Sequence, residues 1–277
     1  MTDPNLNVSE APLGREVAGL TDPGRVRSRN EDQFIAAVYR PELSVLATGL
    51  PVEVQSTPDL EEHDLLVAVA DGMGGHGGGD VASRLAIESV LDAFTAVEPS
   101  SWTIETFIDR IKAAVREAEK RLDGSSGQQP NMGTTLTVAV VSGLEVFIGH
   151  AGDTRAYRLH NGELEQLTTD HTLAEQLRDE IEGLDEDPSS PMHNILYNAL
   201  QANSPRPAHI DVLHAEFQRG DGLVLCSDGL VKEIDTEEMT RILVSSASPQ
   251  ERVGGELVVA AREAGGTDNI TAVWVRV

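Results

Sequence analysis

Short apolar runs separated by polar connections are the main pattern of this chain, and they predict buried β-strands. Runs of this kind cover residues 34–38, 65–70, 135–141, 146–149, 223–226 and 270–277. Each run has the length of a strand and is apolar nearly throughout, so both of its faces should be buried.

A helical spacing of apolar residues marks two neighbouring stretches. The spacing predicts one helix over residues 80–97 and a second over residues 103–122, the second with an apolar face. Ser248 and Glu251, with Pro249 between them, form a capping box that predicts a helix start, and Asp235 with Glu238 predicts another.

The order of these elements indicates an α+β fold. The helices come as a pair and the strands follow one another in hairpin-like pairs, so strands and helices do not alternate strictly. This order favours antiparallel or mixed sheets with outer helices over a doubly wound parallel sheet. Two acidic, proline-marked stretches, 40–64 and 172–207, read as insertions that form solvated loops or a lid.

Composition narrows the class of partner. The chain has 277 residues with 21 Lys and Arg against 46 Asp and Glu, a net charge of −25. This acidic excess argues against nucleic acid and against anionic membrane surfaces, whereas it suits hard cations such as Mg²⁺ and Mn²⁺. The one cysteine, Cys226, excludes an internal disulfide and a thiolate metal cluster.

No targeting or membrane segment is evident. No apolar run approaches the roughly 20 residues that span a bilayer, and the N-terminus lacks the pattern of a signal peptide. We therefore expect a cytoplasmic monomer, with a disordered tail over residues 1–15 and one folded domain over residues 16–277.

Five aspartates are the strongest chemical signal. Each lies next to a predicted buried strand: Asp32, Asp71, Asp153, Asp228 and Asp268. One Asp-Gly pair after a strand is usually a turn. Antiparallel strands, however, bring an aspartate before one strand to the same sheet end as an aspartate after its neighbour. Converging carboxylates favour Mg²⁺ or Mn²⁺, and two such ions can activate a bridging water for phosphoryl transfer.

Two competing motifs are weaker. Gly72–Gly77 matches the G-x-G-x-x-G pattern of dinucleotide-binding proteins, but Asp71 would place a charge beside the pyrophosphate, and the next predicted element is a helix where that fold needs a strand. Cys226 followed by Lys232 is similar to a cysteine phosphatase loop, but lysine stands where that chemistry needs arginine.

Seven short motifs carry a resemblance to a known family. In order they are Gly24–Asp32, Val69–His76, Met132–Thr135, Gly152–Tyr157, Asp170–Thr172, Ser227–Leu230 and Asp268–Thr271. Over residues 17–277 the chain resembles the bacterial branch of the PP2C-type (PPM) metal-dependent serine/threonine protein phosphatases. The resemblance implies a four-layer α-β-β-α sandwich in which helices flank two central antiparallel sheets.

The resemblance also implies a metal site. Two Mn²⁺ or Mg²⁺ ions would be held by Asp32, Asp71, the Gly72 carbonyl, Asp228 and Asp268. Asp153 would bind a third, weaker ion together with Asp228. Arg27 would bind the substrate phosphate and His76 would be the general acid. Glu31 precedes Asp32 and should point to the other face of an extended chain, so we do not expect a direct ligand there.

The implied reaction is hydrolysis of phosphoserine and phosphothreonine in proteins by a metal-bridging water, opposing bacterial Ser/Thr kinases. The alternative is a catalytically weak module of the same fold that binds phosphoproteins. Asn198 and Gln201 depart from the family pattern of arginine and glycine, and Lys232 stands where some members carry an acidic residue near the third metal. Residues 172–207 would form a flap that shapes substrate choice. No departure removes a core-metal aspartate, so we expect an active enzyme.

Overall fold

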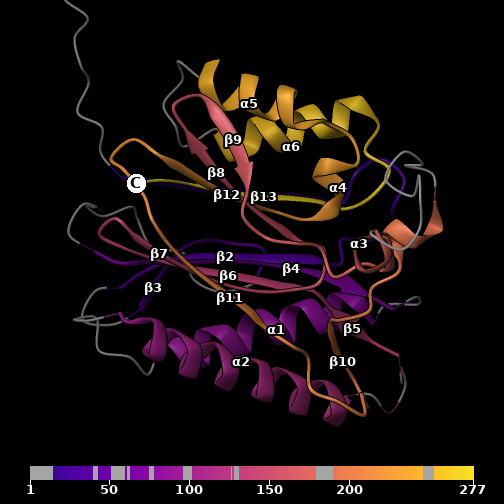
Figure 1. Cartoon of the computed structure of the whole chain (residues 1–277). Coiled ribbons are helices and arrows are strands. Elements are labelled where there is room, and N and C mark those ends of the chain that lie inside the picture. Colours follow the sequence, from indigo (N-terminus) through magenta and orange to yellow (C-terminus); the bar gives the residue numbers. More distant parts are fainter. Residues whose placement is uncertain are drawn as a thin grey trace, which may run out of the picture.

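The computed structural model describes residues 15–39, 43–50, 60, 63–74, 78–95, 102–125, 127, 131–178, 190–245 and 253–277. Two antiparallel sheets lie face to face between two layers of helices (Figure 1). The predicted α+β sandwich of four layers is therefore confirmed. In the described part of the chain, no helix is long and apolar enough to cross a membrane.

One sheet has five strands. Their bounds are β1 Glu16–Asp22, β8 Arg155–His160, β9 Glu163–Gln166, β12 Gly222–Cys226 and β13 Ile270–Arg276. They are ordered β1-β13-β12-β8-β9. Every neighbouring pair in this sheet is antiparallel.

The other sheet has eight strands. Their bounds are β2 Asp32–Tyr39, β3 Leu43–Thr48, β4 Leu65–Met73, β5 Gly133–Thr134, β6 Leu136–Ser142, β7 Glu145–Ala151, β10 Leu200–Gln201 and β11 Asp211–Glu216. Six of them follow the order β10-β5-β4-β6-β7-β11, and β2 pairs with both β4 and β3.

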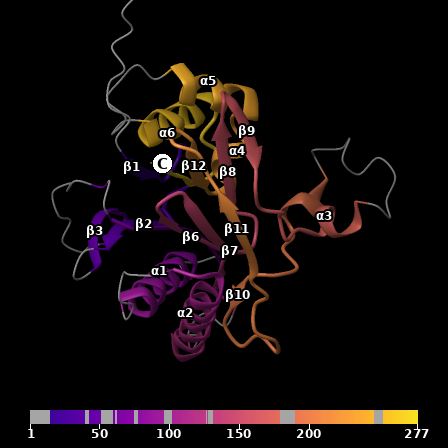
Figure 2. The ribbon, with the colours of Figure 1, turned by 60° about the vertical axis from the view of Figure 1, so that its left-hand side comes forward.

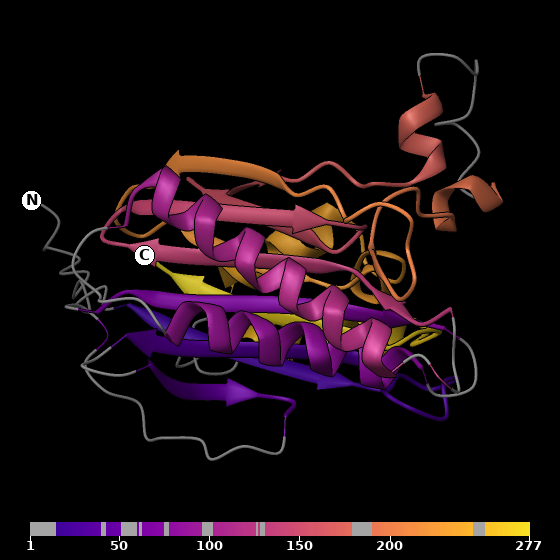
Figure 3. The same cartoon turned by 90° about the horizontal axis from the view of Figure 1, so that it is seen from below.

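Helices cover the outer face of each sheet. The helices α1 (Gly79–Thr95) and α2 (Ile104–Ser125) lie side by side along the eight-stranded sheet (Figure 3). On the five-stranded sheet lie α4 (Asp228–Val231), α5 (Thr236–Ser245) and α6 (Val253–Ala264). The short helices α3 (Leu173–Leu177) and η1 (Pro191–Asn194) stand out to one side of the body (Figure 2).

Three apolar cores separate the four layers, which explains the continuous apolar runs. On β2, Ile35 packs towards α1 and α2, whereas its neighbour Ala36 packs towards the other sheet. On β13, Val273 packs between the sheets, and Trp274 packs towards α5 and α6. A strand buried on both faces needs apolar residues at every position, unlike a half-exposed strand.

The six predicted strands correspond to β2, β4, β6, β7, β12 and β13, with ends that shift by up to three residues. The paired helices are also present as α1 and α2. Asp235 Oδ1 accepts a hydrogen bond of 2.8 Å from the Glu238 amide, which confirms the predicted start of α5. The predicted helix start at Ser248 and residues 179–189 of the second acidic stretch lie outside the described residues, as does the tail except for Arg15.

Edge strands were missed. The expectation of a solvated loop over residues 40–64 is wrong for residues 43–48, which form β3 against β2. The strands β1, β9 and β11 also lie at sheet edges and were not predicted; neither was β8, which lies between β12 and β9 but is only partly buried. An edge strand is only partly buried, so it lacks the apolar run that identifies a central strand.

Close packing between β12 and Trp274 gives a test of the outer core. A Cβ atom at Gly222 would overlap the Trp274 ring, whereas a Cβ atom at Gly255 on α6 would meet only Leu20 Cδ2 at 3.8 Å. Gly222→Ala should therefore lower the free energy of unfolding by about 1–3 kcal/mol. Gly255→Ala should leave it unchanged or raise it by about 0.5–1 kcal/mol. Urea denaturation measures both, and equal midpoints would show that Trp274 repacks freely.

Candidate metal centre and active site

A cavity of about 600 Å³ lies at the end of the sandwich where connections from both sheets meet. Five carboxylate side chains line it: Glu31, Asp71, Asp153, Asp228 and Asp268. Asp71 is on β4 and Asp153 follows β7, both in the eight-stranded sheet. Asp228 begins α4 after β12, and Asp268 precedes β13, both in the five-stranded sheet. The antiparallel pairing thus brings four of the five predicted aspartates to one cavity.

The fifth aspartate, Asp32, is fully buried and begins β2, directly opposite Asp71. Directly opposed residues of antiparallel strands share a face of the sheet, about 5 Å apart. Asp32 Oδ2 accepts hydrogen bonds of 2.7 Å from Ser227 Oγ and Thr271 Oγ1, which belong to the other sheet. Asp32 therefore joins the two sheets at this end of the sandwich.

Burial and mutual repulsion raise the pKa of three of these carboxyl groups, those of Asp32, Asp71 and Asp153. Burial raises the pKa of Asp32 to about 7, even though the two hydroxyl groups lower it, and the charges of Asp228 and Asp268 raise it further. Burial followed by repulsion from Asp228 raises the pKa of Asp153 to about 8. The pKa of Asp71 is raised well above its usual range by burial and then by the charge of Asp32. The site therefore favours positive charge from a proton, a side chain or a metal ion.

Two side chains supply part of that charge. Lys232 Nζ lies 2.5 Å from Asp228 Oδ2 and 3.6 Å from Asp268 Oδ2. Burial alone would lower the pKa of Lys232, but the charge and hydrogen bond of Asp228 raise it. Arg27 Nη2 donates a hydrogen bond of 2.8 Å to Asp268 Oδ2, and the Arg27 side chain is 53% exposed at the cavity.

The donor set fits hard divalent cations. Buried Oδ1 atoms of Asp32 and Asp228 have no hydrogen-bond partner among the described residues, although a buried carboxylate oxygen normally has one. Carboxylate and carbonyl oxygens are the ligands that Mg²⁺ and Mn²⁺ prefer. Within the same described ranges, no three His, Cys, Asp or Glu side chains already surround one point closely enough to hold an ion. The ammonium group of Lys232 occupies one of the carboxylate oxygens at this site, Asp228 Oδ2.

A family model described as protein phosphatase 2C matches residues 54–260. The chain belongs to the protein phosphatase 2C family. The resemblance inferred from the seven motifs is thereby confirmed.

Related proteins agree with this assignment. The "Serine/threonine phosphatase stp" of Listeria monocytogenes is 35% identical over 263 residues, which cover 92% of this chain and 93% of that protein. A serine/threonine phosphatase structure from S. agalactiae matches with a TM-score of 0.79 at 25% identity, covering 95% of this chain and 99% of the other. The catalytic domain of the phosphatase PstP, solved in complex with two manganese ions, matches with a TM-score of 0.70 at 28% identity, covering 95% and 98%.

The glycine segment of this phosphatase 2C chain has a packing role. A Cβ atom at Gly72 would overlap the backbone of Gly79 and the carbonyl of Glu31, so three backbone segments meet there. Gly74 has φ of +128°, a conformation that favours glycine. His76 lies outside the described residues. The dinucleotide interpretation is wrong, because α2 follows α1 directly and Gly72 lines the carboxylate cavity.

Two further predictions, on Glu31 and on Cys226, can be compared with the structure. Glu31 lines the same cavity as Asp71, and its carboxyl group lies beside Gly79 at the start of α1. Asp32 instead contacts the hydroxyl groups of Ser227 and Thr271, so the two neighbouring side chains point in different directions, as predicted. Cys226 is fully buried, and burial raises the pKa of its thiol to about 12, which excludes a reactive thiolate.

The segment from η1 to β10 meets the cavity. Asn194, Ile195, Leu196 and Gln201 line it. The Asn198 side chain contacts His171 Nδ1 at 2.7 Å and exchanges hydrogen bonds of 2.8 and 2.9 Å with the His209 backbone. Gln201 therefore lies in the cavity, whereas Asn198 connects its own segment to His171 and His209.

Several supporting residues were missed by sequence reasoning. Ser227 and Thr271 orient Asp32, and Asn269 Oδ1 accepts the Glu31 amide at 2.8 Å. His171 Nδ1 accepts the Gly152 amide at 3.1 Å, next to Asp153. All four lie inside the seven motifs and three of them are next to an aspartate, but the motifs do not indicate which group each side chain contacts.

The raised pKa values predict an unusual pH dependence of stability. A carboxyl group with a raised folded pKa keeps its proton in the fold at pH values where the unfolded chain has lost it. Without metal, the stability that these groups contribute should therefore be fully present below about pH 4, where the unfolded chain also holds its protons. It should fall as the pH rises from there to about 7 to 8, by at most about 1.4 kcal/mol per pH unit for each carboxyl group. Thermal unfolding in EDTA between pH 5 and 8.5 measures this fall.

Asp32→Asn provides the comparison, since it removes one such carboxyl group. This variant should lose less stability between pH 5 and 8.5 than the wild type. Glu237→Gln, an exposed carboxylate at the start of α5, should follow the wild type and controls for the overall negative charge. A wild-type profile in Asp32→Asn would contradict the assignment of the raised pKa to Asp32.

Proposed function

We propose that this chain is a metal-dependent protein serine/threonine phosphatase, which hydrolyses phosphoserine and phosphothreonine in proteins. The observation that carries this proposal is the cavity where carboxylates of both sheets converge beside a half-exposed arginine. The manganese-containing PstP domain and the named serine/threonine phosphatases among the relatives support it.

The proposed metal ligands are the residues described above. Asp32, Asp71, Asp228, Asp268 and the Gly72 carbonyl would hold two Mn²⁺ or Mg²⁺ ions. Asp153 would hold a third together with Asp228. When bound, such ions lower the pKa of a coordinated water and polarise the phosphoryl oxygens, which is the chemistry that ester hydrolysis needs.

Hydroxyl groups of the opposite sheet prepare Asp32 for this role. Ser227 and Thr271 both donate to Oδ2, so that oxygen is already engaged and Oδ1 is left to accept a cation. Partners behind a ligand fix its orientation and commonly affect metal affinity by an order of magnitude or more.

Arg27 is placed to bind the phosphate. The guanidinium carries five N–H donors, and one of them donates a hydrogen bond to Asp268. The remaining donors can form a forked contact with phosphate oxygens, which lysine cannot reproduce. Its pairing with Asp268 would keep the bound phosphate beside the carboxylates.

The leaving serine or threonine alkoxide needs a proton. We propose His76 as the proton donor, solely because of its position in the Val69–His76 motif. We further propose residues 16–277 as the phosphatase domain, residues 172–207 as its flap, and proteins phosphorylated by a bacterial Ser/Thr kinase as the substrates.

Phosphate release from a phosphothreonine peptide tests the function. Protein stripped with EDTA should be inactive, and Mn²⁺ should restore turnover. Asp228→Asn should reduce the Mn²⁺-dependent rate at least about a hundredfold, because it removes a carboxylate charge that is proposed to hold more than one of the metal ions. Asp92→Asn, an exposed substitution of the same kind on α1, is the matched control.

Three outcomes would be informative. Turnover that survives EDTA, or that persists in Asp228→Asn, would refute the metal-dependent mechanism. Mn²⁺ binding without release of phosphate would favour the phosphoprotein-binding module.

Substitution of Lys232 gives a second test, which measures Mn²⁺ affinity and does not depend on turnover. Its ammonium group must leave Asp228 Oδ2 before a cation can use that oxygen. Lys232→Gln should therefore tighten Mn²⁺ binding by about three- to tenfold, equivalent to roughly 1 kcal/mol. Isothermal titration of the metal-free protein measures this, with Lys112→Gln on α2 as the control. Unchanged or weaker binding in Lys232→Gln would show that Lys232 does not compete with the metal.

A further inference from the structure

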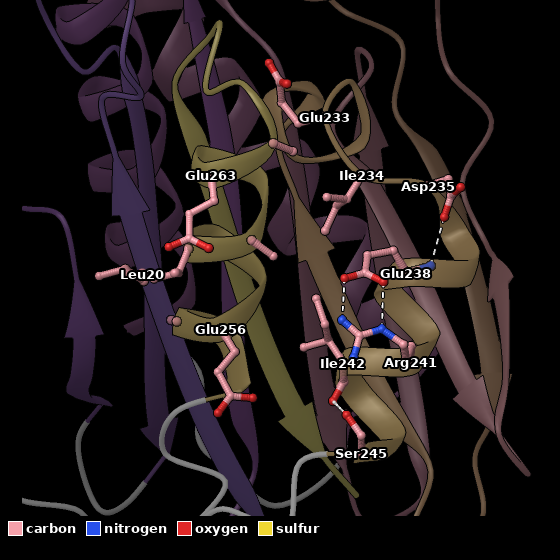
Figure 4. Close-up of a pocket in the computed structure, with 15 residues that line it drawn as sticks. Leu20, Glu233, Ile234, Asp235, Glu238, Arg241, Ile242, Ser245, Glu256 and Glu263 are labelled. Atoms are coloured by element: carbon pink, nitrogen blue, oxygen red, sulfur yellow. Dashed lines mark hydrogen bonds and ion pairs between the residues drawn. The ribbon is translucent and has the colours of Figure 1, made fainter.

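A second large hollow lies on the opposite side of the five-stranded sheet from the inter-sheet core. It is a groove of about 980 Å³ between α5 and α6, closed at one side by β1 (Figure 4). Its apolar lining comes from Leu20, Ile234, Ile242, Val259, Ala260 and Ala264. It shares no lining residue with the carboxylate cavity.

The apolar lining is partly open to solvent. Ile234 and Ile242 are buried and form the floor, whereas Leu20 is 40% exposed and Val259 is 49% exposed. Large apolar side chains that are exposed together in a groove are typical of surfaces that bind another molecule.

The rim of the groove is acidic. Among the described residues that line it, the carboxylates are Glu233, Asp235, Glu238, Glu256 and Glu263, and the cationic side chain is Arg241. Arg241 is engaged by Glu238, with Nε 2.7 Å from Oε2 and Nη2 2.5 Å from Oε1. The rim therefore presents an excess of negative charge around an apolar centre.

The spacing of residues along α6 sets the distance between two of these acidic side chains. Glu256 and Glu263 are seven residues apart, and Val259 and Ala260 lie between them on the same helical face. At 1.5 Å per residue the two carboxylates are separated by about 10 Å along the helix. Figure 4 shows them on one side of the groove, with Leu20 between them.

We propose that this groove is a docking site for a segment of a partner protein in which apolar side chains lie between two basic ones. The basic side chains would be about 10 Å apart on one face, which corresponds to positions i and i+7 of a helix. The apolar side chains would contact Leu20 and Val259, and the basic ones would face Glu256 and Glu263. Complementary charge at such a rim sets the choice and register of the partner.

A synthetic peptide tests this directly, without reference to catalysis. The probe is a fluorescein-labelled peptide of about three helical turns, with lysines at i and i+7, leucines at i+3 and i+4, and alanine and glutamine elsewhere. A scrambled peptide of the same composition controls for attraction to the acidic protein as a whole. Fluorescence anisotropy at about 0.15 M salt, where long-range attraction is screened, should show at least tenfold tighter binding of the patterned peptide.

Substitutions in the groove test whether the patterned peptide binds there. Glu256→Gln with Glu263→Gln should weaken binding of the patterned peptide at least fivefold, and Val259→Ser should weaken it to a similar extent. Glu105→Gln with Asp109→Asn, two exposed positions on α2, removes the same charge from the opposite layer and should have no effect. All of these substitutions are at the surface, and thermal unfolding would verify that each variant is folded.

Three results would overturn the proposal. The first is equal or absent binding of the two peptides, and the second is wild-type affinity in the groove variants. The third is a dimer in analytical ultracentrifugation that Val259→Ser disperses, since the groove would then hold a second copy of this chain.

Discussion

Repulsion among buried carboxylates is the constraint around which one end of this molecule is organised. Asp32 and Asp71 face each other across β2 and β4, and Asp228 and Asp268 approach from the other sheet. Such an arrangement is unfavourable in isolation, because each buried charge raises the cost of the next. It persists because hydroxyl groups, Lys232 and Arg27 compensate part of the charge, and because three apolar cores hold the strands in place.

The architecture separates stability from chemistry. The interior strands are apolar on both faces, so their packing does not depend on the charged end of the sandwich. The charged side chains lie where strands begin or end, on connections that the sheets hold rigidly. Functional groups commonly lie on connections positioned by a rigid scaffold, and here two sheets share the task. A metal ion bound between them would bridge the two sheets as well as promote hydrolysis.

Sequence alone predicted the elements buried on both sides and the aspartates at their ends. The central strands carry unbroken apolar runs, and an aspartate beside such a run is easily recognised. The edge strands β1, β3, β9 and β11 were missed because one side of each faces solvent, and their composition is close to that of a loop. The partners of the site were missed for a different reason. Whether Ser227 or Thr271 reaches Asp32 depends on how two sheets face each other, which no local pattern records.

One short turn belongs to both surfaces of the five-stranded half. Lys232 lines the carboxylate cavity, and the next residue, Glu233, lines the groove between α5 and α6. Glu233 Oε1 also accepts the Thr267 amide at 2.7 Å, one residue before Asp268. The two surfaces are therefore joined by a single peptide unit and a single carboxylate. Natural variation at position 233 would consequently be restricted by both the groove and the carboxylate cavity. A substitution that suits a new partner in the groove would have to preserve the hydrogen bond to the Thr267 amide.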